Sequence, residues 1–219
     1  MKKFAVILSG CGVYDGAEIQ EAVLTLLAID KAGATYHCFA PDMLQYHVIN
    51  HVSGKELPEK RNVLVESARI ARGKIDPLSL FNASDYDGMI FPGGFGAAKN
   101  LCTWAISGNQ CKVNTDVEVA VKSMFVEGKP IGAMCIAPVI LAALFKGTVL
   151  TTGHDPASQG FIENMGNVYA VSRHGEVVID KTRNLFTTPC YMLDASISQI
   201  ALGTENIIRA MLKSMTGAG

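Results

Sequence analysis

The sequence has little charge, no charge excess of either sign and no long apolar run. Only 18% of its 219 residues are charged, with 19 Lys and Arg against 20 Asp and Glu. Nucleic-acid binders usually carry a basic excess, and a membrane span needs about 18 consecutive apolar residues. The hydrophobic content of 49% also excludes intrinsic disorder. We therefore expect a globular protein without nucleic acid or membrane among its partners.

The cysteines form no Cys-x-x-Cys pair, so neither a structural zinc site nor a disulfide framework is expected. The six lie at positions 11, 38, 102, 111, 135 and 190. The apolar stretch Phe4–Leu8 is too short for a signal peptide and suits a buried strand better. We therefore expect a cytoplasmic protein with reduced thiols and no bound metal.

Strand-like and helix-like segments alternate along the chain. Short strands are predicted at 4–8, 35–40, 86–91, 131–134, 148–152, 177–180 and 185–188. Helices are predicted at 17–31, 61–72, 115–127, 136–145, 156–165 and 193–213. This alternation predicts an α/β fold, with a mainly parallel sheet covered by helices on both faces. We interpret the more polar residues 43–80 as an insertion within a single domain, 1–219.

In such sheets, ligands bind at the carboxyl ends of the strands. Cys135 directly follows the predicted strand 131–134, between the small residues Ala133 and Ala137. These allow the sharp strand-to-helix turn of a nucleophile elbow, and the positive end of the next helix favours a thiolate. The alternative is a buried, unreactive cysteine.

A glycine pair, Gly93–Gly94, follows the predicted strand 86–91. Its backbone N–H groups suit an oxyanion or a phosphate, although a plain tight turn explains the pair equally well. Lys99 and Asn100 follow and either border this site or lie in solvent.

Acidic residues, among them Asp15, Glu18 and Glu21, gather near the start of the first helix. Acids there complement the helix dipole. Glu21 has a second possible role, because one turn into the helix it could reach Cys135 as a base or a hydrogen-bond partner.

The glycine-rich first loop allows a competing interpretation. Gly10, Gly12 and Gly16 approximate a dinucleotide-binding fingerprint, with Asp42 as the ribose acid. The last glycine spacing is one residue too long, and the acid lies about 30 residues on instead of about 20.

Two histidines are candidates for the same edge of the sheet. His154 follows the predicted strand 148–152, and His174 has the His-x-Glu spacing of a glutamine amidotransferase triad. The alternative for each is an ordinary histidine without a catalytic role, either exposed to solvent or hydrogen-bonded within the fold.

Together these segments resemble the glyoxalase ElbB family, also called enhancing lycopene biosynthesis proteins or isoprenoid biosynthesis proteins with an amidotransferase-like domain. The matching strings are SGCGVYDG at 9–16, EI at 18–19, EAV at 21–23, FPGGFGAAKNL at 91–101, MCIAP at 134–138, TTP at 187–189 and YM at 191–192. The family belongs to the class I glutamine-amidotransferase-like group, beside the PfpI proteases and the Parkinson-disease-associated deglycase.

The resemblance implies a flavodoxin-like three-layer fold, with Cys135 as nucleophile and Glu21 beside it. It also implies an oxyanion site at the N–H groups of Gly94 and Ile136. The implied protein is a homodimer that converts glyoxal to glycolate without a cofactor.

We therefore predict an enzyme that acts on small aldehydes and is not an active glutamine amidotransferase. His154 is an assisting acid or base, while Gly93, Glu18 and Asn100 border the substrate. The alternative is a non-catalytic stress protein in which the same cysteine senses oxidants.

Overall fold

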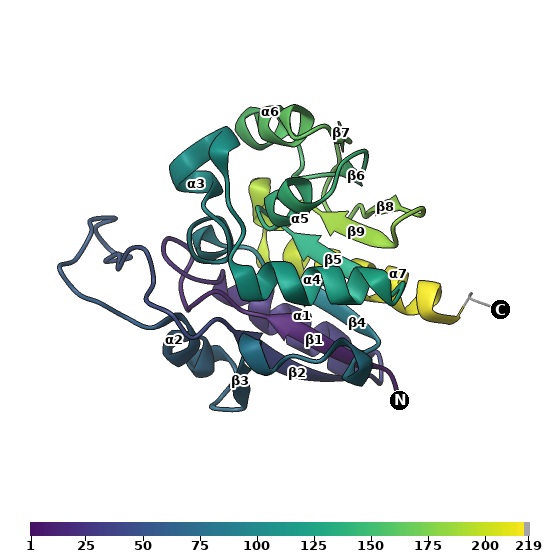
Figure 1. The fold of residues 1–219 in the computed structure, drawn as a ribbon, viewed down its shortest axis with the longest axis horizontal. Helices are drawn as coiled ribbons and strands as arrows, with labels where there is room; N and C mark the ends of the chain where they lie inside the picture. Colours follow the sequence, from purple (N-terminus) through teal and green to yellow (C-terminus); the bar gives the residue numbers. More distant parts are fainter. Residues whose placement is uncertain (217–219) are drawn as a thin grey trace.

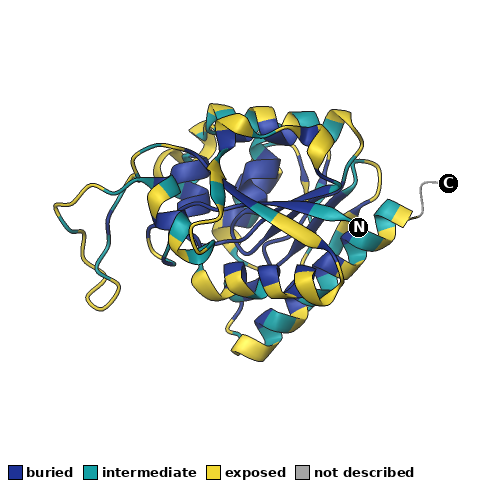
Figure 2. Ribbon diagram, turned by 90° about the horizontal axis from the view of Figure 1, so that it is seen from below, coloured by how far each residue is buried: buried dark blue, intermediate teal, exposed yellow. Residues whose placement is uncertain are grey.

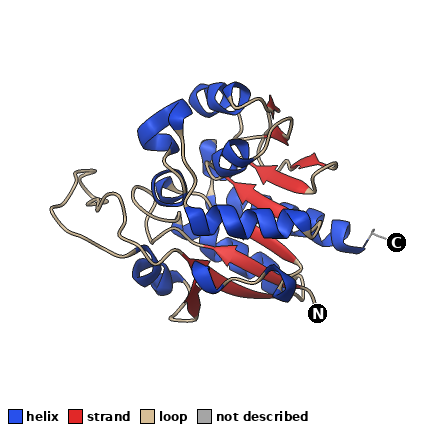
Figure 3. Cartoon of the chain, viewed as in Figure 1, coloured by secondary structure: helices blue, strands red, loops and turns tan. Residues whose placement is uncertain are grey.

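A seven-stranded sheet lies between two layers of helices in the computed structural model, which describes residues 1–216 (Figures 1 and 3). The strand order is β3-β2-β1-β4-β5-β9-β8, and only β8 runs antiparallel to its neighbour. These strands are β1 (Lys3–Ile7), β2 (Thr35–Ala40), β3 (Ile75–Pro77), β4 (Gly88–Phe91), β5 (Ile131–Met134), β8 (Val178–Asp180) and β9 (Leu185–Thr188). The predicted α/β, flavodoxin-like fold is confirmed.

Helices cover both faces of the sheet, which explains why its central strands are continuous apolar runs. One face carries α1 (Ile19–Lys31), α2 (Val63–Ile70) and α7 (Ile197–Thr216), and the other carries α4 (Thr115–Val126) and α5 (Pro138–Leu144). Figure 2 shows the buried strands between these layers.

The chain order places the switch point of the sheet between β1 and β4. From β1 the chain first runs outward through β2 and β3, and β4 then returns to the other side of β1. Ligands of open α/β sheets bind beside such a point, outside the carboxyl ends of the strands. The loops after β1, β4 and β5 therefore meet at one edge.

Residues 43–80, predicted as an insertion, have two parts. Residues 41–62 form an excursion that protrudes at the left of Figure 1, with isolated bridges of Leu44 to Asn62 and Ile49 to Glu56. By contrast, α2 and β3 complete the edge of the sheet, where β3 pairs with β2.

The predicted strand 148–152 does not join the central sheet. Its residues form β6 (Val149–Leu150), which pairs with β7 (Val168–Tyr169) in a separate two-stranded sheet next to α6 (Pro156–Asn164). A π-helical turn at Ala97–Leu101 and the short α3 (Trp104–Ser107) were not predicted. Within residues 1–216, no helix combines the length and hydropathy that a bilayer crossing requires.

Packing of α7 on the sheet should contribute strongly to stability. Ile207, on the buried face of α7, is fully buried in the hydrophobic core. We expect Ile207→Ala to lower the free energy of unfolding by about 2–5 kcal/mol, because it leaves a cavity. Val126, which is 83% exposed at the end of α4, provides the control. Val126→Ala should change stability by less than about 0.5 kcal/mol in urea unfolding; equal losses in the two variants would contradict the assignment.

Candidate functional site

Cys135 lies in the sharp turn between β5 and α5. Its φ of 57° is in the left-handed region, which costs a non-glycine residue about 1–2 kcal/mol. Its N–H donates to the Thr188 carbonyl at 3.0 Å, and this bond from the neighbouring strand end holds the turn. The flanking Ala133 and Ala137 are fully buried, so larger side chains would not fit beside it. The local geometry is that of a nucleophile elbow.

Glu21 reaches this turn from the first turn of α1. Its side chain is fully buried and hydrogen-bonds to the Cys135 thiol. One carboxylate oxygen accepts from the Gly93 N–H at 3.0 Å, and the other accepts from the Tyr191 N–H at 3.1 Å. Glu18 caps the helix by accepting from the Glu21 N–H at 2.6 Å. Three segments distant in sequence thus fix one carboxyl group against one sulfur.

Gly93 makes this contact possible because it has no side chain. A Cβ on Gly93 would lie 2.3 Å from the Cys135 Cβ, 2.8 Å from its Sγ and 2.6 Å from Glu21 Oε2. Gly94 is equally restricted: its φ is +93°, and a Cβ there would lie 2.4 Å from the Glu18 nitrogen. The glycine pair therefore brings the strand end directly against the reactive groups.

The N–H groups predicted to form an oxyanion site separate into two roles. Those of Gly94 and Ile136 donate to the Cys135 sulfur. The N–H of Gly93 is used by Glu21 instead. An oxygen on a carbon bonded to the sulfur would lie close to the first two donors.

Burial dominates the electrostatics of the pair. It raises the pKa of Glu21 to about 8, against the opposing hydrogen bond from the Tyr191 N–H. Burial also raises the pKa of the Cys135 thiol, and the negative charge of Glu21 raises it further. The N–H groups of Gly94 and Ile136 act in the opposite direction. The predicted stabilisation of the thiolate at the start of the helix is therefore present. It is outweighed by burial and by the nearby carboxyl, because the two groups share a buried site.

The two candidate histidines lie apart from this contact. His154 is exposed, in the turn before α6. His174 lies in the turn before β8, where Glu176 accepts from the Arg173 N–H at 2.7 Å. Within residues 1–216, neither imidazole is among the groups hydrogen-bonded to Cys135 or Glu21.

Asn100 borders the site but turns its polar atoms inward. Its amide nitrogen donates to the carbonyls of Ser9 and Asp15 at 2.9 and 3.0 Å, and its oxygen accepts from the Tyr46 N–H at 2.9 Å. The side chain is 3% exposed. Asn100 thus joins the first loop to the excursion, and these bonds occupy the atoms predicted to face a substrate.

The first loop also satisfies its own N–H groups, which weighs against the dinucleotide interpretation. The Gly10 N–H donates to the Ser67 hydroxyl, and the Gly16 N–H donates to the Gly12 carbonyl. Asp42, the candidate ribose acid, accepts from the Asn62 amide. A pyrophosphate would need such donors to be free.

Tyr191 was missed by sequence reasoning. Its N–H holds Glu21 across a sequence separation of 170 residues, and a backbone donor leaves no signature in residue type. In the described part of the chain, no group of three or more His, Cys, Asp or Glu side chains is arranged to hold a metal ion.

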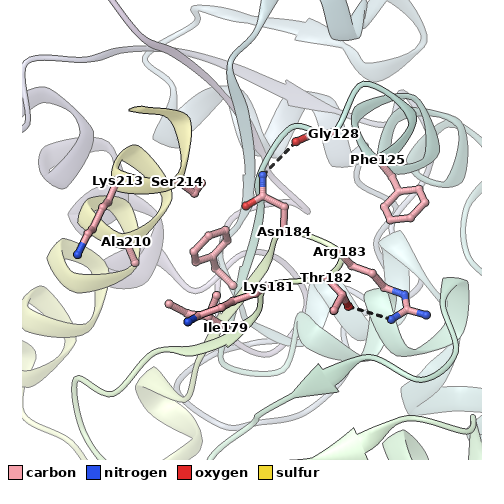
Figure 4. Close-up of a pocket in the computed structure, with 11 residues that line it drawn as sticks. Phe125, Gly128, Ile179, Lys181, Thr182, Arg183, Asn184, Ala210, Lys213 and Ser214 are labelled. Carbon is pink, nitrogen blue, oxygen red and sulfur yellow. Dashed lines mark hydrogen bonds between the residues drawn. The ribbon is translucent and has the colours of Figure 1, made fainter. Parts of the chain in front are cut away.

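The cavity in Figure 4 lies at the opposite end of the sheet. Its volume is about 800 Å³. The turn before β9 forms part of its wall, with Lys181, Arg183 and Asn184 among the lining residues. The Asn184 carbonyl accepts from the N–H of Ile131, the first residue of β5. The cavity is therefore at the amino end of the central strands, away from Cys135.

Glu21 should make the protein less stable as pH rises. Unfolded Glu21 releases its proton near pH 4.5, whereas the folded protein holds it until about pH 8. The folded state therefore binds more protons in this window, and stability falls by up to about 1.4 kcal/mol per pH unit. Urea unfolding between pH 5 and 9 should show this slope, and Glu21→Gln should remove it. An unchanged slope in Glu21→Gln would assign the effect to other groups.

Solved structures identify the fold's relatives. An isoprenoid biosynthesis protein with an amidotransferase-like domain from Ehrlichia chaffeensis is 36% identical, has a TM-score of 0.92 and matches 99% of this chain and 100% of its own. A DJ-1 superfamily protein from Agrobacterium tumefaciens shares the fold at 16% identity and a TM-score of 0.56, over 100% of this chain and 92% of its own.

Curated relatives match almost the whole chain. The human glutamine amidotransferase-like class 1 domain-containing protein 3, mitochondrial, is 44% identical over 98% of this chain and 84% of its own length. The mitochondrial ES1 protein of Danio rerio is 33% identical over 95% and 84%. The predicted cytoplasmic location is contradicted, since these relatives are mitochondrial by name. Targeting segments, not the residues of a fold, carry such an address, so the prediction had no support in the fold.

The family assignment rests on these relatives, because no protein-family model matches the chain. Their identity and coverage agree with the structure, and the predicted resemblance is confirmed. The chain belongs to the family of ES1 and ElbB-like proteins with an amidotransferase-like domain.

Proposed function

We propose that the protein is a cofactor-independent glyoxalase that converts glyoxal and similar small aldehydes to hydroxy acids. The observation that carries the proposal is the buried contact between the Cys135 thiol and the Glu21 carboxyl, with N–H groups of Gly94 and Ile136 directed at the sulfur. A nucleophile, a proton acceptor and oxyanion donors are the groups that thiol addition to a carbonyl requires.

The reaction begins when Glu21 takes the thiol proton and the Cys135 sulfur attacks one aldehyde carbon. The carbonyl oxygen becomes an alkoxide near the N–H groups of Gly94 and Ile136, and Glu21 returns the proton to give a hemithioacetal. Glu21 then moves a proton from this carbon to the neighbouring carbon through an enediol. The product is a glycolyl thioester, and water hydrolyses it to glycolate and the free thiol.

The proton balance of the pair sets the pH range of this chemistry. Below about pH 8 both Glu21 and Cys135 hold a proton, so Glu21 is not yet a base. Loss of one proton leaves a single negative charge that the oxygen and the sulfur share. Either distribution of that charge allows the first step.

The raised pKa of Cys135 favours an enzyme over an oxidant sensor. A sensor needs a thiolate that is exposed and formed at low pKa, whereas Cys135 is 6% exposed. An active glutamine amidotransferase would need a histidine as base, and here Glu21 occupies the position beside the sulfur.

Replacement of the nucleophile tests the proposal. Cys135→Ser should lower kcat/KM for glyoxal by about 1000-fold or more, because a neutral hydroxyl is a poor nucleophile without a matched base. Glycolate formation followed by chromatography measures it. Cys38→Ala, which removes a buried thiol in β2, is the control and should retain activity. Undiminished turnover in Cys135→Ser, or rapid oxidation of Cys135 to sulfinic acid without wild-type turnover, would overturn the enzyme assignment.

The pH profile tests the role of Glu21. We expect kcat/KM to rise with pH and to level off above an apparent pKa of about 8, because only the singly protonated pair reacts. Glu21→Gln should lose about 100-fold or more in kcat/KM and should no longer show this limb. A variant that keeps both the rate and the limb would exclude Glu21 as the base.

A further inference from the structure

Two cysteines outside the Cys135 site lie together at the base of one loop. An antiparallel bridge joins Cys102 to Val113, and the Thr103 N–H donates to the Lys112 carbonyl at 2.9 Å. Alternate residues of a strand share one face. Cys111, two positions before Val113, is therefore the diagonal neighbour of Cys102 on that face. The two side chains are close enough to perturb each other's titration, and the Cys102 thiol donates to the Ala97 carbonyl at 3.4 Å.

The two thiols differ in ways that suit a reactive and a resolving cysteine. Cys102 is 1% exposed, whereas Cys111 is half-buried and open to solvent. Its neighbour Cys102 lowers the pKa of Cys111, and the polar groups of Thr103 lower it further against the opposing effect of partial burial. The neighbouring Cys111 and burial both raise the pKa of Cys102. The accessible sulfur is therefore the one whose thiolate is favoured.

A cavity gives small molecules a route to the buried partner. Cys102, Thr103, Ile106 and Lys112 line this cavity, whose volume is about 520 Å³. The space is large enough for a peroxide, and it is lined by Cys102 and by Lys112, the residue next to Cys111.

We propose that Cys102 and Cys111 form a reversible intrachain disulfide when the protein meets a hydroperoxide. The Cys111 thiolate attacks one peroxide oxygen, which gives a sulfenic acid and releases the other oxygen as water. The Cys102 sulfur then attacks the sulfenic sulfur, loses its proton and displaces hydroxide, which leaves as a second water. Both sulfurs are oxidised by one electron each, and one hydrogen peroxide is reduced to two water molecules.

The disulfide would close a loop next to the first loop of the site. The π-helical turn before Cys102 carries Lys99 and Asn100, which donate to the carbonyls of Tyr14 and Ser9. Cross-linking residues 102 and 111 restricts the unfolded chain, so the oxidised protein should have a higher midpoint of thermal unfolding. We expect a rise of about 3 °C or more.

The test uses the full chain with Cys135→Ser, so that peroxide reacts with no catalytic thiol. Trypsin cuts after Lys99 and Lys112 and releases residues 100–112 as one peptide with both cysteines. After stoichiometric hydrogen peroxide and alkylation with N-ethylmaleimide, this peptide should carry no label and should lack two hydrogen atoms. Dithiothreitol should restore two labelled thiols. Because the nucleophile is absent, the result is independent of the glyoxalase proposal.

Matched variants separate the proposed pair from incidental oxidation. Cys102→Ser should stop at a Cys111 sulfenic acid that dimedone traps, and Cys111→Ser should leave Cys102 labelled. Cys38→Ala should behave as the parent chain does. The folded protein should form the bond faster than the chain in urea. Two labelled thiols after peroxide, a bond between separate chains, or faster closure in urea would each overturn the proposal.

Discussion

The site depends on the absence of one Cβ. The space that a side chain on Gly93 would fill holds the Cys135 sulfur and a Glu21 oxygen. With the glycine there, a carboxyl from α1 and a thiol from the turn after β5 can share a proton in a dry environment. Most other contacts around the site, from the Glu18 cap to the Tyr191 N–H, fix one member of this group.

The same burial that positions the pair determines its chemistry. A carboxyl in water would already be ionised at neutral pH, and a thiol in water would be partly ionised one or two units higher. Side by side in the core, the two groups share one negative charge. Backbone N–H groups stabilise that charge whether it lies on the carboxyl oxygen or on the sulfur. In the proposed reaction this gives a base of suitable strength, while the folded state loses stability at the pH where that base forms.

The layered α/β fold follows from the sequence because doubly covered strands are continuous apolar runs and helices have their own period. Glu21 and Cys135 were predicted as neighbours because parallel strands end at one edge. The edge strand β3, only three residues long, gave no comparable signal. The orientation of the Asn100 side chain could not be predicted from the sequence either, since it depends on a hydrogen bond to a carbonyl about 90 residues away in the chain. Local pattern predicts elements well, but backbone partners distant in sequence leave no trace in residue type.

The close packing around Gly94 limits where the protein can change. Added atoms at Gly94 or Gly96 would collide with the backbone of residues 9 and 16–18, which lies at the base of the site. The excursion 41–62 and the turn that carries the exposed His154 stand outside this packing. Substitutions at the centre would therefore disturb the elbow or the carboxyl beside it, whereas the excursion and the His154 turn can vary without touching either.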